Sequence, residues 1–264
     1  MTPRISVIMG IYNCATTLPD ALDSLLAQTF QEFKVIMCDD GSRDNTYEVA
    51  QSYVNKFPEK FVLIKNDKNL GLNQTLNNCL ELADTEYIAR MDGDDLSLPD
   101  RFEKEINFLD SNPEYAIVSG PMIYFDENGE FRRGKGNSEV TKKNFIKGSP
   151  FCHAPCMVRK IAYDKVEGYT VDPKLLRVED YHLWFKMYAA GYKGYNLKEP
   201  VYAMRDDRNA KLRRTWQNRL NEKFVRSIGY KMIGIPWYLR LYRFRPIIIG
   251  LLPNFIYNYL HKFR

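Results

Sequence analysis

Three aspartates lie within residues 92–95, directly after an apolar run at 86–91 that predicts a strand. At the end of a strand, carboxylates this close together repel one another unless a divalent cation lies between them. Their oxygens are hard ligands that suit Mg²⁺ or Mn²⁺, and such an ion commonly completes its shell with substrate phosphates. Asp92, Asp94 and Asp95 therefore indicate chemistry on a nucleotide diphosphate, with a solvated acidic turn as the alternative for an isolated run of this kind.

The elements that would position these acids follow a repeating pattern. Residues 1–125 alternate between short apolar runs and helical patterns, which is typical of stacked β-α units. Strands are expected at 5–10, 34–38, 61–64 and 86–91, each followed by a helix. Ligands of open α/β sheets bind at the carboxyl ends of the strands, so one crevice can collect residues 10–12, 39–40 and 92–95.

Several residues are predicted to cap the helices of this pattern. Thr17 and Asp44 precede two of the helical segments, and residues 97–100 have the pattern of a capping box. Beyond residue 115 the sequence predicts two further strands at 116–120 and 122–125, with a turn at 127–129. A looser region follows at 152–158, then a helix at 178–190 and an extended segment at 195–204.

Length and composition set the broad class. A chain of 264 residues is long enough for one large domain, or for one domain with an appended segment. Its five cysteines are scattered and odd in number, which predicts no disulfide framework and indicates a reducing compartment. We see no signal peptide before the first expected strand, so a cytoplasmic location is expected.

The charge is distributed unevenly along the chain. The net charge is +5, yet residues 205–264 carry 14 basic against 3 acidic residues, a net of +11 that leaves −6 for residues 1–204. A mildly acidic body therefore carries a strongly basic tail.

The motifs in their order and spacing resemble the inverting family 2 glycosyltransferases of bacterial polysaccharide synthesis. The matching stretches are residues 7–13, 38–46, 69–71, 89–102 and 178–184, and the resemblance covers about residues 4–205. Residues 150–153 and 194–197 look closest to the members that make exopolysaccharide, the matrix of biofilms. The resemblance implies an α/β GT-A fold, a mostly parallel mixed sheet flanked by helices, with a C-terminal helical basic extension.

The resemblance also implies a division of the chain. Residues 1–204 would form the glycosyltransferase domain, with a nucleotide-binding half at about 1–125 and an acceptor half at about 126–204. Residues 205–264 would form a basic, aromatic-rich helical tail that associates with a membrane.

The family's roles for the donor site fall on residues near the strand ends. Ile11 and Tyr12 would hold the nucleotide base, and Asp40 would accept a hydrogen bond from uracil N3–H, which favours a UDP donor. Asp39 and Asp40 could instead cap the following helix. Asn69 and Gly71 could contact the nucleotide from a helix N-terminus or form a plain loop.

The acid cluster and the end of the domain complete the donor site that the resemblance implies. Asp92 would face the ribose and contribute to the metal site, Asp94 would bind Mn²⁺ or Mg²⁺, and Asp95 would support it. Gly93 replaces the alanine of many relatives, a mild departure that should not harm metal binding. Arg205 and Arg208 could clamp the diphosphate or form a solvated basic face.

Asp180 resembles the catalytic base that removes the proton of the acceptor hydroxyl. Glu179 beside it is expected to raise its pKa, because adjacent like charges disfavour double ionisation. The alternative is an acid pair that interacts with the dipole at a helix N-terminus. One base with a cation on the leaving group suits an inverting transfer, and nothing marks the paired acid and nucleophile of a retaining glycosidase.

Three further residues, His153, His182 and Trp184, are candidates for an acceptor or diphosphate site. A zinc site at His153 is not expected, because no second Cys/His pair follows nearby. A site-facing and a buried structural role are equally open for His153, and His182 could shape the acceptor pocket or pack.

The basic tail ends in an apolar run of about 14 residues, interrupted by Pro253 and Asn254. A membrane-spanning helix needs about 20 residues, so the run should not cross a bilayer. Basic residues among aromatic ones suit a helix that lies on an anionic membrane surface. Packing on the catalytic domain or on a partner subunit remains the alternative, and no nucleic-acid module accompanies the charge.

Together these patterns predict a metal-dependent inverting glycosyltransferase that uses a nucleotide sugar and a lipid-linked saccharide acceptor at the inner face of the cell membrane. Other polysaccharide-assembly proteins are possible partners. A nucleotidyltransferase is an alternative, but residues 10–18 lack its Gly-rich triphosphate loop. A non-catalytic regulatory protein on the same scaffold is the second alternative.

Overall fold

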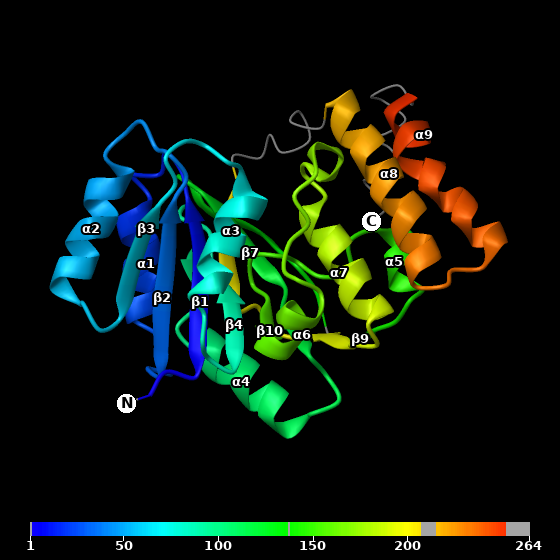
Figure 1. The fold of residues 1–264 in the computed structure, drawn as a ribbon. Helices are drawn as coiled ribbons and strands as arrows, with labels where there is room; N and C mark the ends of the chain where they lie inside the picture. The colour runs from blue at the N-terminus through cyan, green and yellow to red at the C-terminus, as the bar shows by residue number, and fades with distance from the viewer. Residues whose placement is uncertain (1, 137, 207–214, 252–264) are drawn as a thin grey trace.

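A computed structural model describes residues 2–136, 138–206 and 215–251 (Figure 1). Its strands are β1 Ile5–Ile11, β2 Phe33–Asp39, β3 Phe61–Lys65, β4 Tyr87–Arg90, β5 Leu96–Ser97, β6 Ile117–Ser119, β7 Met122–Asp126, β8 Gly129–Arg133, β9 Ser138–Val140, β10 Met157–Arg159, β11 Gly194–Asn196 and β12 Tyr202–Arg205. Its helices are α1 Leu18–Leu26, α2 Thr46–Lys56, α3 Leu72–Glu81, α4 Arg101–Ser111, α5 Asn144–Lys147, α6 Lys160–Lys165, η1 Pro173–Leu175, α7 Glu179–Ala189, α8 Trp216–Met232, η2 Trp237–Phe244 and α9 Arg245–Leu251.

The larger sheet has the strand order β3-β2-β1-β4-β10-β6-β11-β9. Its first four strands are parallel, with Ile11 opposite Asp39 on β2 and Ile8 opposite Arg90 on β4. The carboxyl ends of β1, β2 and β4 therefore meet at one edge of the sheet, as the strand pattern predicted. β10 runs antiparallel between β4 and β6, which makes the sheet mixed.

A smaller sheet, of order β5-β12-β7-β8, completes the edge that bears the acid cluster. β5 follows Asp95 directly and pairs antiparallel with β12, with Leu96 opposite Ala203. The pairing places Arg205, the last residue of β12, beside the turn that holds the aspartates.

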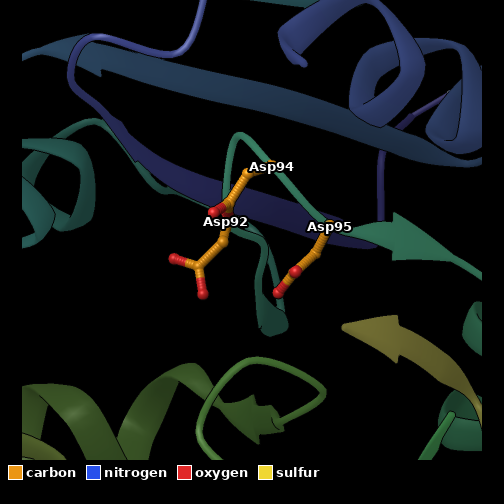
Figure 2. A group of neighbouring side chains, drawn as sticks. All are labelled: Asp92, Asp94 and Asp95. Atoms are coloured by element: carbon orange, nitrogen blue, oxygen red, sulfur yellow. The ribbon is translucent and has the colours of Figure 1, made fainter. Parts of the chain in front are cut away.

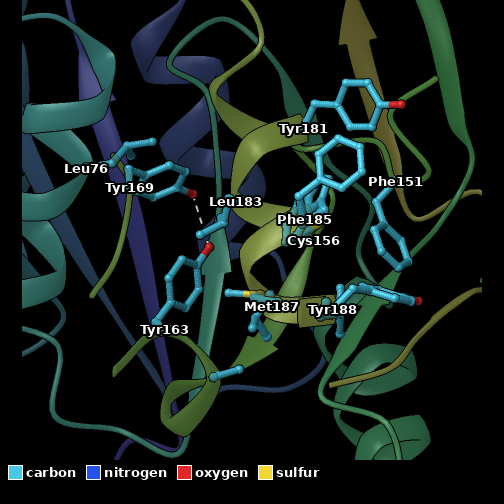
Figure 3. Close-up of a cluster of buried hydrophobic side chains, with 14 of the residues drawn as sticks. Leu76, Phe151, Cys156, Tyr163, Tyr169, Tyr181, Leu183, Phe185, Met187 and Tyr188 are labelled. Atoms are coloured by element: carbon cyan, nitrogen blue, oxygen red, sulfur yellow. Dashed lines mark hydrogen bonds between the residues drawn. The ribbon is translucent and has the colours of Figure 1, made fainter. Parts of the chain in front are cut away.

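Helices cover both faces of the larger sheet. Along β1 the side chains alternate, so Val7 and Met9 pack with α1 and α4 while Ile8 packs with α3 and α7. Figure 3 shows part of the hydrophobic cluster that contains Ile8. Tyr181, Phe185 and Tyr188 of α7 lie among the buried rings of this cluster. α7 is therefore anchored in the core, and its first turn is held at a defined place.

The first part of the basic tail packs on the body. α8 lies beside α7 (Figure 1), and the rings of Phe185 and Tyr230 are 6.0 Å apart. Val225 and Tyr230 are fully buried in the same cluster as α7, together with Ile233. This outcome matches the alternative in which the tail packs on the catalytic domain. Residues 252–264, which include most of the final apolar run, lie outside the described part.

None of the helices in the described ranges is both long and apolar enough to cross a bilayer. Trp237 is 78% exposed and Leu241 63% exposed on η2, so apolar side chains remain on the surface of the tail.

The structure corrects the predicted helix caps. The capping box at residues 97–100 is wrong, because Ser97 belongs to β5 and α4 starts at Arg101 without a side-chain cap from Asp100. Thr17 occupies the N-cap position of α1, but its hydroxyl donates to the Gly93 carbonyl oxygen at 2.9 Å. Asp44 does accept the backbone N–H of Thr46, at 3.1 Å, one residue before the N-cap of α2.

Candidate active site

The three aspartates form one cluster on the turn between β4 and β5. One carboxylate oxygen from each of Asp92, Asp94 and Asp95 lies within 4.8 Å of the others. Figure 2 shows the three side chains projecting toward the same side of the turn. Asp94 is exposed and Asp95 is only 3% exposed, so the cluster spans the boundary between solvent and core.

The electrostatics of the cluster fit a divalent cation. Burial raises the pKa of Asp95 to about 8, and the charges of Asp92 and Asp94 add to the shift. Burial also raises the pKa of Asp94, again with a contribution from Asp92. A cation among these oxygens would relieve the repulsion, and the all-oxygen donor set suits Mg²⁺ or Mn²⁺.

Arg90, the last residue of β4, is a site residue that the sequence analysis missed. Its side chain is buried and forms an ion pair with Asp92. Its Nε has no hydrogen-bond partner within the described ranges. An arginine in an otherwise apolar strand is the sequence signal that could have identified it.

Three neighbouring cavities share lining residues and form one cleft along the sheet edge. The largest, about 520 Å³, is lined by Arg90, the three aspartates and Arg205, and on another side by residues of the η1–α7 loop and of α8. A second, of about 380 Å³, shares Asp92, Asp94 and Arg205 with the first. A third, of about 190 Å³, shares Gly10 and Tyr12 with the second.

The smallest cavity contains the predicted base-binding residues Tyr12, Asp40, Asn69 and Gly71. Asp40 is buried, and its Oδ1 accepts the N–H of Leu70 at 2.7 Å while its Oδ2 accepts the N–H of Gly71 at 3.0 Å. Asp40 thus shapes the 69–71 loop. An ionised carboxylate offers about four acceptor positions, so Oδ2 retains capacity for a ligand N–H.

The side chains of Asp39 and Ile11 do not fit the roles that were predicted for them. Asp39 accepts the N–H of Ser42 at 3.3 Å and lies 3.8 Å from Lys65 Nζ, so neither it nor Asp40 caps α2. Ile11 is 1% exposed and packs in the core, and its carbonyl accepts the N–H of Asp40 at 2.9 Å. The Ile11 side chain therefore does not hold the base, and a role of the Ile11 backbone stays a prediction; of the two residues, Tyr12 lines the cavities.

Asn66 is a second residue that sequence reasoning missed. Its amide donates to Asp40 Oδ1 at 2.8 Å and to Thr75 Oγ1 at 3.0 Å. Its carbonyl oxygen accepts from Asn78 at 2.8 Å and from the Cys38 thiol at 3.4 Å. Asn66 therefore fixes the orientation of Asp40, and its place just beyond the expected strand at 61–64 is the available signal.

Glu179 and Asp180, the two acids at the start of α7, interact electrostatically with Arg90, which also forms the ion pair with Asp92. Ser149 Oγ donates to Asp180 Oδ2 at 3.0 Å. Burial raises the pKa of Asp180, and the charge of Arg90 counters part of that rise. Val178, two residues before Asp180, lines the largest cavity, whereas Glu179 and Asp180 themselves line none of the three cavities.

Burial and mutual repulsion both act on the pair Glu179 and Asp180, and the pKa of each is raised. Burial raises the pKa of Glu179, and the charge of Asp180 raises it further. Burial is the main cause for Asp180 itself. Glu179 Oε2 is buried without a hydrogen-bond partner in the part of the chain that the structure describes.

Arg205 lies against the acid cluster. Its backbone N–H donates to Asp95 Oδ1 at 2.8 Å, and its Nε donates to the Asp94 carbonyl oxygen at 3.1 Å. Its guanidinium also lies 3.6 Å from the carboxylate of Asp20. Arg208, the second predicted clamp, lies outside the described residues.

Side-chain packing explains why residue 93 is a glycine. A Cβ at this position would lie 2.7 Å from Cys14 Sγ, so the glycine makes room for the cysteine side chain. The second cavity is lined by Cys14, Gly93 and Tyr12. An alanine at position 93 would therefore require the Cys14 side chain to shift.

The three candidates for an acceptor or diphosphate site are corrected. Trp184 is fully buried and packs on Phe151, with ring centroids 5.3 Å apart, because it lies on the core side of α7. His153 Nε2 bonds Tyr169 Oη at 2.8 Å, as a structural histidine does, and His182 is 8% exposed. None of the three lines the cavities described above.

Comparison with known proteins identifies the family. A profile described as "Glycosyl transferase family 2" matches residues 6–166. The chain belongs to this family. It is 37% identical over 263 residues to the putative glycosyltransferase EpsE of Bacillus subtilis, covering 99% of this chain and 94% of that protein. The amylovoran biosynthesis glycosyltransferase AmsE of Erwinia amylovora is 33% identical over 206 residues, or 76% of this chain and 75% of that protein.

A further relative carries a more specific name. The UDP-Glc:alpha-D-GlcNAc-diphosphoundecaprenol beta-1,3-glucosyltransferase WfaP of Escherichia coli is 27% identical over 195 residues, covering 73% of each chain. The family 2 chain is therefore a glycosyltransferase with relatives in bacterial polysaccharide biosynthesis, and the predicted family is confirmed.

Solved structures confirm the predicted GT-A fold. Residues 1–349 of Staphylococcus aureus TarS, in complex with UDP-GlcNAc, superpose with a TM-score of 0.70 at 18% identity, covering 93% of this chain and 73% of that one. The mannosyltransferase PcManGT from Pyrobaculum calidifontis, in complex with GDP-Man and Mn²⁺, has a TM-score of 0.62 at 16% identity, covering 96% of this chain and 77% of that one.

Proposed function

We propose that this enzyme transfers a sugar from a UDP-sugar to a lipid-linked saccharide acceptor, with inversion and with a divalent cation, in the synthesis of a bacterial surface polysaccharide or exopolysaccharide. The observation that carries the proposal is the composition of the largest cavity. Its lining includes Asp92, Asp94 and Asp95 as well as Val178 at the start of α7.

The donor side of the proposal rests on Asp40 and Tyr12. An ionised carboxylate accepts hydrogen bonds only, so the free capacity of Asp40 Oδ2 suits an imide N–H such as uracil N3–H. The exposed ring of Tyr12 offers a surface for a base. The uridine nucleotides bound to TarS support the same choice.

Asp94 and Asp92, supported by Asp95, would hold Mn²⁺ or Mg²⁺. When bound, the cation supplies positive charge against the charge that develops on the leaving diphosphate. Arg205 adds a fixed positive charge on the same side of the cleft, because its backbone and Nε are bonded to the cluster.

Asp180 would remove the proton of the acceptor hydroxyl as that oxygen attacks the sugar carbon. A base works best when its pKa approaches the working pH, and burial moves the pKa of Asp180 in that direction. The Ser149 hydroxyl donates to Oδ2 of the carboxylate and so orients it. Attack from the face opposite the diphosphate inverts the anomeric configuration.

The tail supports a location at the inner face of the membrane. Residues 215–251 contain seven basic residues and one acidic residue, beside the exposed Trp237 and Leu241. Such a surface suits anionic lipid, where a lipid-linked acceptor and other polysaccharide-assembly proteins would be met.

The metal role is tested with Asp94→Ala. Mn²⁺ should increase the thermal stabilisation that UDP-sugars give to the parent protein, and the variant should bind Mn²⁺ at least about tenfold more weakly, a loss of about 1.4 kcal/mol. Glu59→Ala, an exposed carboxylate at the opposite end of β3, is the matched control. Equal Mn²⁺ and UDP-sugar affinity in Asp94→Ala and the parent would show that the assigned metal role is wrong.

A further inference from the structure

The largest cavity has a basic wall that the donor chemistry does not use. Besides the aspartates and Arg205, it is lined by Arg177 from the loop before α7 and by Asn218, Arg219 and Glu222 from the first turns of α8. Arg177 and Arg219 do not line the two cavities on the nucleotide side, whereas Arg205 lines both the largest and the second cavity. The two arginines therefore belong to the side of the cleft that is away from the base.

Arg177 is available to a ligand. Its side chain is exposed and makes no hydrogen bond or ion pair with any residue in the ranges 2–136, 138–206 and 215–251. Its backbone φ is +69°, in the left-handed region that non-glycine residues rarely adopt. The fold maintains this conformation at the entrance to α7, immediately before Val178 and the two acids.

Arg219 of α8 is held in place by contacts with α9. Its Nη1 donates to the Pro246 carbonyl oxygen of α9 at 3.2 Å. A Cβ on Gly250 would lie 2.6 Å from Arg219 Cδ, so the glycine allows α9 to pack closely against the arginine stem. The Arg219 side chain lines the cavity, and among the described residues its guanidinium makes no hydrogen bond other than the one to Pro246.

The only acidic residue on the α8 part of this wall is already neutralised. Glu222 Oε1 accepts from Arg226 Nη2 at 2.8 Å, and Arg226 is 1% exposed. The wall is thus positive overall, opposite a cluster of carboxylates in the same cavity. Arginine forks match phosphate oxygens in pairs, which favours a phosphate-bearing ligand here.

We propose that Arg177 and Arg219 bind the diphosphate of a prenyl-diphosphate-linked acceptor, an inference that rests on the proposed function and specifies its acceptor. The acceptor saccharide lies toward the aspartates and Asp180, and the diphosphate lies on the basic wall. The prenyl chain continues over η2 and α9, where Leu241, Tyr242 and Ile248 are exposed around a shallow apolar cavity of about 310 Å³. The bond from Arg219 to Pro246 connects these two regions directly.

The test measures the binding of farnesyl diphosphate, inorganic pyrophosphate and UDP to the full chain by calorimetry in EDTA, where no metal can bind a diphosphate. Arg177→Gly removes the guanidinium and keeps the backbone conformation, because glycine accepts a positive φ without strain. Arg177→Lys restores the charge, and Lys165→Ala removes an exposed charge from α6 as the control.

Farnesyl diphosphate should bind the parent more tightly than pyrophosphate does, and Arg177→Gly should weaken it by about tenfold or more, as expected for the loss of a charge-assisted contact. Arg219→Gln should act in the same direction, Arg177→Lys should recover part of the affinity, and Lys165→Ala should have no effect. Thermal unfolding of each variant shows whether the fold is intact.

Two results would overturn the inference. If Arg177→Gly weakened UDP as much as farnesyl diphosphate, the arginines would serve the donor. If pyrophosphate bound the parent as tightly as farnesyl diphosphate, the ligand would be the free ion and not a lipid-linked one. Failure of the metal role would appear separately, in the Mn²⁺ titration of Asp94→Ala.

Discussion

At the scale of single residues, Arg90 organises the charge of the cleft. Its guanidinium interacts electrostatically with the three aspartates of the cluster and with both Glu179 and Asp180. One buried cation therefore interacts with acids that lie 84 or more positions apart in the sequence. Its charge offsets part of the rise in pKa that burial causes at Asp94, Glu179 and Asp180.

Ser149 provides a test of the proposed base that leaves the carboxylate itself in place. The Ser149 hydroxyl bonds the ionised form of Asp180 and lowers its pKa. Ser149→Ala should therefore raise that pKa further, and the acid limb of the kcat/KM profile should move to higher pH, because the base must be ionised to accept a proton. The KM for the donor should stay unchanged.

Ser52→Ala, which alters a hydroxyl bonded only within α2, is the control for this experiment. An acid limb at the same pH in Ser149→Ala and the parent would remove Asp180 from the role of base.

The residue types and spacing of the sequence predicted the acid cluster and Asp40 at the strand ends, and the family resemblance singled out Arg205. Arg90 and Asn66 were missed because their partners come from other segments, which only the folded chain brings together. The error at Ile11 has a simpler origin. Strand side chains alternate, and Ile11 has the same parity as Val7 and Met9, which face the core.

At the scale of elements, the packing of α8 against α7 decides whether the basic wall forms. Gly229 of α8 lies against Phe185, and a Cβ there would be 2.2 Å from the ring. The sequence did not reveal this contact, because the many charges of the tail obscure the short apolar stripe of Val225, Gly229 and Tyr230.

Gly229→Ala should therefore destabilise the protein by about 1–3 kcal/mol, the usual cost of overpacking a core. On a helix that packs against nothing, the same change would stabilise the protein by up to about 1 kcal/mol. The two cases therefore predict opposite signs for the change in the free energy of unfolding. Urea unfolding measures the difference, with Ser227→Ala on the same helix as the control. A more stable Gly229→Ala protein would show that α8 does not pack on α7 as described.

At the scale of the whole molecule, the active cleft and the exposed apolar surface of the tail adjoin the same helix. α8 lines the largest cavity with its first turns and is followed directly by η2 and α9. This neighbourhood of cleft and apolar surface could not be predicted without knowing how residues 215–251 pack on the rest of the chain. The sequence showed only that the tail is basic and rich in aromatic residues.

Membrane association predicts a specific response to two exposed substitutions. Trp237→Ala together with Lys231→Gln should lower partitioning onto anionic vesicles by at least about tenfold, since one basic residue near such a surface contributes about 1 kcal/mol and the indole adds apolar contact. Co-sedimentation measures the partitioning onto vesicles. Raising the salt concentration to 0.5 M roughly halves the Debye length and should weaken the binding of the parent protein to the vesicles.

Lys165→Gln, on α6, is the charge-matched control for the vesicle experiment. Equal binding of the double variant and the parent would place the membrane contact elsewhere or exclude it.

The central claim is that acids from β4 and from α7 act on the two sides of one transfer reaction. The most direct measurement compares Asp180→Asn with the parent in donor binding and in turnover, with Asp164→Asn as an exposed control. UDP-sugar and Mn²⁺ affinities should remain within about twofold while transfer falls by about 10²–10⁴-fold, the usual contribution of a general base. Turnover equal to that of the parent, or a parallel loss of donor affinity, would contradict this account.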